Sequence, residues 1–98
     1  MLFVIQFRDR ADKRHLRPEL LPKHLEFLAG LGERLRTAGS LRVEADDSAA
    51  GGLWVLDVAN FDEVRAIYTE DPFWKGGLRE SVEIHRLAKA FPEIEKKV

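Results

Sequence analysis

The chain has 98 residues, with 16 basic and 17 acidic side chains, a formal net charge of -1 and no cysteine. The missing cysteines exclude disulfide scaffolds, thiolate metal sites and thiol nucleophiles. The balanced charge offers no electrostatic footprint for nucleic acid, and no apolar run approaches the roughly 20 residues that a membrane helix requires.

This length predicts a single domain over residues 1–98 that can bury a core without a metal or disulfide staple. The apolar start, residues 1–5, is far too short for the hydrophobic region of a secretory signal. We therefore expect a cytoplasmic protein with neither a membrane nor nucleic acid as its partner.

Residues 2–7 predict a first strand that is largely apolar on both faces. Alternate positions from Phe3 to Phe7 form one face, and Leu2 and Val4 begin the other. A strand exposed to water on one side would alternate more cleanly. The sheet is therefore expected to be covered on both faces.

A basic loop, residues 8–17, follows this strand. Its ordinary interpretation is a solvated loop, but Arg14 and Arg17 could also attract a small anion toward a nearby pocket. A long helix is expected next, from Arg17 to Ala38. Gly39 suits the left-handed conformation that ends many helices.

His24 stands out in this helix because it interrupts an apolar stripe. The stripe has helical spacing and contains Leu21, Leu28, Leu31 and Leu35. The imidazole should therefore point inward or toward a cavity. A core histidine hydrogen-bonded to a backbone carbonyl explains the pattern as well as a functional one, since a buried polar group needs only a partner.

Three further strands are expected, at residues 40–45, 53–59 and 78–87, with a turn over residues 46–52. The charged tail, residues 92–98, is expected to be loose.

A second helix begins after Asn60, whose side chain caps it, with Glu63 as the reciprocal partner of a capping box. The helix must finish by Asp71, because a residue that precedes a proline disfavours the helical region.

These elements follow one another in the order βαββαβ. That order predicts an α+β, ferredoxin-like fold, an antiparallel sheet with two helices on one face. The apolar second face of the sheet then needs a cover. A second copy of the chain is the economical one, so we expect a two-fold homodimer.

Asp71 precedes Pro72, and two interpretations of this aspartate stay open. It can cap a short helical turn whose first residue is the proline. It can also meet His24 if the two helices lie side by side. A carboxylate that accepts a hydrogen bond from one ring nitrogen fixes the tautomer and makes the other nitrogen more basic, as general acid–base catalysis requires.

The run DPFWKGGL adds Phe73 and Trp74, either as core anchors or as the apolar wall of a pocket for a planar ligand. The histidines lack the compact spacing of metal ligands, so no metal or other cofactor is expected. No serine has the context of a hydrolase nucleophile.

The chain resembles the YCII-related (YciI-like) family over nearly its whole length. The resemblance is carried by MLFVIQFRD, PKHLEFLAGLGERLRTAGSL, DPFWKGGL and the final strand. It implies ferredoxin-like domains that dimerise into an α+β barrel, with a histidine and an aspartate proposed as a catalytic pair. By motif position these are His24 in PKHL and Asp71 in DPF. Some relatives are linked to dehydrochlorination of chlorinated hydroxyquinol rings.

Two positions depart from the family pattern. Leu21 stands where relatives often carry an arginine or a small polar residue, and Gly39 precedes Ser40 where Gly-Pro is common. A contact to an anionic substrate would therefore have to come from Arg14 or Arg17.

Three functions are consistent with the sequence. The first is a cofactor-independent lyase or isomerase of the dehydrochlorinase type acting on a small molecule, such as an aromatic one. In it His24 is the general base, Asp71 orients the imidazole, and Phe73 and Trp74 shape the pocket. The second is a dimer that binds a small ligand without converting it. The third is an accessory module in which the histidine is structural.

Overall fold

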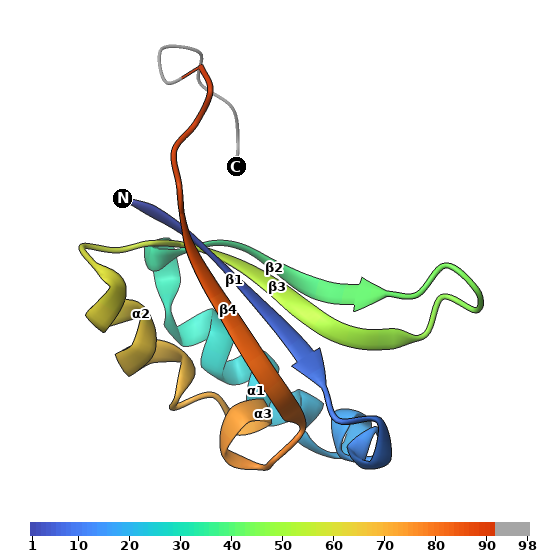
Figure 1. The fold of residues 1–98 in the computed structure, drawn as a ribbon. Helices are drawn as coiled ribbons and strands as arrows, with labels where there is room; N and C mark the ends of the chain where they lie inside the picture. Colours follow the sequence, from blue (N-terminus) through green and yellow to red (C-terminus); the bar gives the residue numbers. More distant parts are fainter. Residues whose placement is uncertain (92–98) are drawn as a thin grey trace.

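The computed structural model describes residues 1–91, and the expected tail at 92–98 lies outside the described residues. The elements follow the predicted order of strands and helices (Figure 1). They are β1 (Leu2–Asp9), η1 (Ala11–Lys13), α1 (Leu16–Gly30), η2 (Gly32–Arg34), β2 (Leu35–Arg42), β3 (Ala49–Asp57), α2 (Phe61–Tyr68), α3 (Pro72–Lys75) and β4 (Arg79–Leu87).

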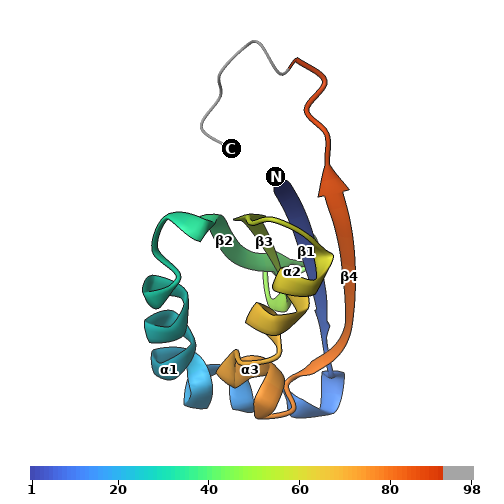
Figure 2. The same cartoon turned by 90° about the vertical axis from the view of Figure 1, so that its left-hand side faces the viewer.

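The strands form one antiparallel sheet in the order β2-β3-β1-β4. Strand β1 is central and pairs with both β3 and β4, as the ferredoxin-like plan requires. Figure 2 shows α1, α2 and α3 on the same side of this sheet. The predicted α+β, ferredoxin-like fold is confirmed. Within residues 1–91, no helix is long and apolar enough to cross a bilayer.

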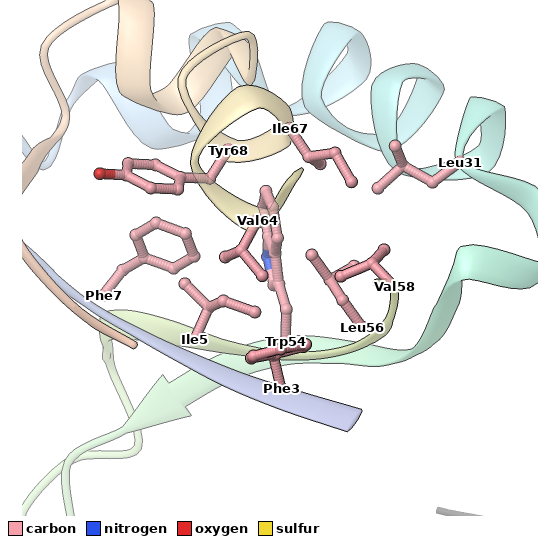
Figure 3. Packing of buried hydrophobic residues seen from close by; sticks show 10 residues of the cluster. All are labelled: Phe3, Ile5, Phe7, Leu31, Trp54, Leu56, Val58, Val64, Ile67 and Tyr68. Carbon is pink, nitrogen blue, oxygen red and sulfur yellow. The ribbon is translucent and has the colours of Figure 1, made fainter. Parts of the chain in front are cut away.

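The hydrophobic core lies between the sheet and the helices (Figure 3). Strand β1 contributes every second residue to it, which is the period of a strand with one face buried. The ten buried members of the core are Phe3, Ile5, Phe7, Leu31, Trp54, Leu56, Val58, Val64, Ile67 and Tyr68.

The long helix is shorter than the leucine spacing predicts. It ends at Gly30, and the chain turns through η2 before entering β2 at Leu35. Gly32 makes this turn possible, because its φ of 59° lies in the left-handed region that glycine adopts without strain. Gly39 is consequently an interior residue of β2, and its predicted role as a helix cap is wrong.

The β2–β3 hairpin is also shifted from the predicted boundaries. The predicted strand at 40–45 is observed at Leu35–Arg42, and the one at 53–59 at Ala49–Asp57. The turn is closed by a hydrogen bond from the Val43 amide to the Ser48 carbonyl at 3.0 Å. The second helix follows the prediction more closely, since the Asn60 side chain accepts from the Glu63 amide at 2.9 Å.

The sheet face turned away from the helices is covered by no other element of the described residues (Figure 2). Strand alternation places Leu2, Val4 and Leu53 on this face, where they are half-buried.

Candidate functional site

His24 and Asp71 form a buried hydrogen-bonded pair between α1 and α3. The Nδ1 atom of His24 lies 2.7 Å from Oδ1 of Asp71, and the two side chains are 8% and 0% exposed. A carboxylate can only accept, so the neutral imidazole carries its proton on Nδ1 and donates it to the aspartate. Nε2 is then the nitrogen that can accept a proton.

Asp71 holds the histidine and caps α3 at the same time. Its Oδ1 also accepts a hydrogen bond from the Phe73 amide at 3.2 Å, and Pro72 occupies the first turn of the helix. The two interpretations that the sequence left open therefore describe one arrangement. The cap fixes the carboxylate through the backbone, and the fixed carboxylate orients the imidazole.

Phe73 supports the other side of this arrangement. Its ring is fully buried and stacks on the His24 imidazole, with centroids 3.8 Å apart and planes inclined by 10°. The imidazole is therefore held by a hydrogen bond at one edge and by a ring on one face. Nε2 has no hydrogen bond within residues 1–91 and is not among the buried atoms without a partner, so it is accessible to solvent.

His24 lines a cavity of about 260 Å³ between α1 and the β2–β3 half of the sheet. The cavity exists because the sheet carries small residues there, so no side chain fills the space above the backbone. Its lining consists of Arg17, Leu21, His24, Leu25, Leu28, Ala38, Gly39, Ser40, Arg42, Gly51, Gly52, Trp54 and Arg79.

An ion-pair network that the sequence analysis missed lies beside the pair. Both oxygens of the Asp9 carboxylate accept hydrogen bonds, Oδ2 from Nη2 of Arg17 at 2.7 Å and Oδ1 from Nη1 of Arg79 at 2.7 Å. Burial lowers the pKa of the Arg79 guanidinium, while the hydrogen bond to Asp9 opposes that shift.

One signal could have revealed this network. Asp9 continues the alternation of the three buried residues Phe3, Ile5 and Phe7, so its side chain is directed to the buried face of β1. A carboxylate on that face requires a cationic partner, and two arginines, Arg17 and Arg79, provide it.

The other predicted site residues fall into two groups. Arg17 lines the His24 cavity, and Phe73 stacks on the imidazole. Trp74 instead packs edge-on against Tyr68, with centroids 4.8 Å apart, and does not line the cavity. Arg14 lines a separate hollow at the end of β1. The structure therefore does not bring Arg14 or Trp74 to the histidine.

Leu21, which departs from the family pattern, lies at the cavity and is 37% exposed. Within residues 1–91, no three histidine or carboxylate side chains cluster as metal ligands would.

The fold and the site together define a ferredoxin-like α+β domain with a buried His–Asp pair facing a small cavity. The chain belongs to the YCII-related domain family, whose model matches residues 1–88. It is 31% identical to Protein YciI of Escherichia coli O6:H1 and, equally, to that of Shigella flexneri, over 93% of this chain and 100% of each relative.

Solved structures share the fold. The chain is similar to the 5-chloro-2-hydroxyhydroquinone dehydrochlorinase TftG of Burkholderia phenoliruptrix AC1100, with 27% identity and a TM-score of 0.81 over 90% of this chain and 94% of the other. That protein was solved in complex with 2,5-dihydroxybenzoquinone. SnoaB, a cofactor-independent oxygenase from Streptomyces nogalater, shares the fold at 14% identity and a TM-score of 0.53, over 93% of this chain and 95% of the other.

Proposed function

We propose that this chain is a cofactor-independent enzyme of the lyase or isomerase class, of the dehydrochlorinase type, acting on a small planar molecule in the cytoplasm. The observation that carries the proposal is the 2.7 Å hydrogen bond between His24 and Asp71, because it leaves Nε2 basic and accessible at a cavity. The similarity to TftG supports the reaction type.

In this mechanism His24 moves the proton and Asp71 stabilises the charge that results. Nε2 takes a proton from a hydroxyl group of the ring, and the imidazolium keeps its Nδ1 hydrogen bond to the carboxylate. That proton is returned to the ring carbon that bears the chlorine, so the hydroxyl becomes a carbonyl and the carbon becomes tetrahedral. A second ring hydroxyl then gives its proton to Nε2, its electron pair forms the second carbonyl through the conjugated ring, and chloride leaves with the electrons of the C–Cl bond. The net loss is HCl, so the reaction balances without an oxidant or a cofactor.

The direct test is anaerobic incubation of the protein with 5-chloro-2-hydroxyhydroquinone, with no cofactor added. We expect chloride release and quinone absorbance to rise well above the spontaneous rate measured in buffer. Binding of the compound without conversion would overturn the enzymatic proposal and favour a ligand-binding dimer.

We further propose that the active form is a homodimer joined through the open face of the sheet. Leu2, Val4 and Leu53 give this face an apolar centre that no described element covers. In a two-fold dimer a glutamate at Val4 would meet its own copy or the partner's apolar centre, at the cost of a buried charge.

The dimer can be tested by analytical ultracentrifugation. We expect the wild type to sediment as a dimer and Val4→Glu as a monomer. Gln6→Glu is the matched control, because this residue lies on the same face of the same strand but is already exposed and polar. A wild type that stays monomeric at high concentration would contradict the proposal.

A further inference from the structure

The Arg79 guanidinium lines the His24 cavity, and not all of its N–H groups have a hydrogen-bond partner within the described residues. The residue is only 5% exposed, and of its nitrogens Nη1 is bonded to Asp9. Nε is buried without a hydrogen-bond partner in the part of the chain that the structure describes. Nη2 lies against the sheet, 2.9 Å from the position that a Cβ on Gly52 would occupy.

Arg17 adds a second guanidinium to the same cavity. Its Nε and Nη2 are directed to Asp9, and Nη2 also donates to the Gly51 carbonyl at 3.0 Å. Nη1 has no hydrogen bond within residues 1–91 and is not a buried atom lacking a partner, so it is accessible, and Arg17 is one of the residues that line the cavity.

The two arginines and the histidine surround one ring. Relative to the centroid of Phe73, the His24 imidazole lies at 3.8 Å, the Cζ of Arg79 at 4.9 Å and the Cζ of Arg17 at 5.2 Å. All three side chains also line the same cavity, so the proton acceptor and the guanidinium donors can act on one small molecule.

Two guanidinium groups share one carboxylate beside the cavity. Asp9 pairs with both Arg17 and Arg79, whereas Asp71 pairs with His24. A purely structural ion pair would not need unsatisfied N–H groups, because each buried donor without a partner costs about 1–3 kcal/mol. The spare donors are explained if the ligand supplies an anionic oxygen.

We propose that the cavity takes an acidic enol or phenol and that Arg79 and Arg17 form the subsite for its oxyanion. The ligand O–H bond breaks, the proton goes to Nε2 of His24, and the electron pair stays on the oxygen. The guanidinium groups then donate hydrogen bonds to this oxyanion. This inference rests on the proposed function in using the same cavity and the same proton acceptor. It goes beyond that function in naming the acidity of the ligand and the groups that recognise it.

Gly52 provides a specific way to block this subsite. A Cβ at position 52 would lie 2.9 Å from Nη2 and 3.3 Å from Nη1 of Arg79, so the guanidinium would have to move. Gly30 lies outside this cavity, and a Cβ there meets nothing within 4 Å. Gly52→Ala and Gly30→Ala are therefore a matched pair.

The test compares calorimetric binding of two quinones with the same ring, 2,5-dihydroxybenzoquinone, which ionises, and 2,5-dimethoxybenzoquinone, which does not. We expect the wild type to prefer the dihydroxy compound by at least about tenfold. Arg79→Lys and Gly52→Ala should each lose about 10- to 100-fold of the affinity for it, the worth of a charged hydrogen bond. Gly30→Ala should bind like the wild type.

Several results would overturn the subsite. These are equal affinity for both quinones, no binding of either at millimolar concentration, or an unchanged preference in a folded Gly52→Ala protein. Circular dichroism establishes the folding of each variant. Selective binding of the dihydroxy compound without chloride release from the chlorinated substrate would keep the subsite and reject the enzymatic function, so the two proposals fail separately.

Discussion

His24→Gln is expected to lower turnover by about 100- to 10,000-fold, the range that a positioned general acid–base group contributes. Glutamine can still donate to Asp71, so the pair keeps a hydrogen bond while Nε2, the proton acceptor, is lost. The measurement is kcat with the chlorinated substrate. His15→Gln is the matched control, because His15 is exposed before α1 and makes no side-chain cap.

Asp71 variants separate the orienting role of the carboxylate from its role as a cap. Asparagine caps helices as well as aspartate does, so Asp71→Asn should fold normally and lose about 10- to 100-fold in kcat through the missing charge. Asp71→Ala removes the hydrogen-bond partner of both the Phe73 amide and His24. We expect it to lower the free energy of unfolding by about 2–4 kcal/mol. An unchanged kcat in His24→Gln or in Asp71→Asn would contradict the mechanism.

The site could be predicted where a polar residue broke a local pattern. His24 interrupts an apolar helical stripe, and Asp71 precedes a proline, so both were visible without knowledge of the tertiary structure. The Asp9 network was not recognised, because its partners, Arg17 and Arg79, lie 8 and 70 residues away along the chain. Arginines at such separations carry no local signal of pairing.

The boundaries of β2 were missed for a similar reason. Leu31 and Leu35 continue the helical spacing of α1, yet Leu35 begins a strand that pairs with β3. Two features override the helical pattern. The turn at Gly32 is local, whereas the pairing of β2 with β3 joins residues far apart in the sequence. Helix propensity is a weak prior against such tertiary pairing.

Phe73 and Trp74 were predicted to share one role, as the wall of the pocket or as core anchors, but their side chains have different partners in the structure. They are adjacent on α3, so their side chains leave the helix in different directions. Phe73 stacks on the His24 ring, and Trp74 packs edge-on against Tyr68.

Phe73→Ala is therefore expected to be the most damaging truncation in this motif, lowering the free energy of unfolding by about 3–5 kcal/mol. The ring is fully buried and stacks on the His24 imidazole. The guanidinium groups of Arg17 and Arg79 also pack over the ring. Its loss opens a cavity and also leaves the imidazole without the surface that fixes its plane.

Trp74→Ala is the matched comparison, because the neighbouring ring is larger but only partly buried. Its truncation should cost about 1–3 kcal/mol through lost area and the edge contact with Tyr68. Both values come from urea unfolding at one fixed protein concentration, since a dimer's stability depends on concentration. A larger loss for Trp74→Ala than for Phe73→Ala would show that the motif anchors the core through the tryptophan. The support of His24 by Phe73 would then be a minor part of the stability of the domain.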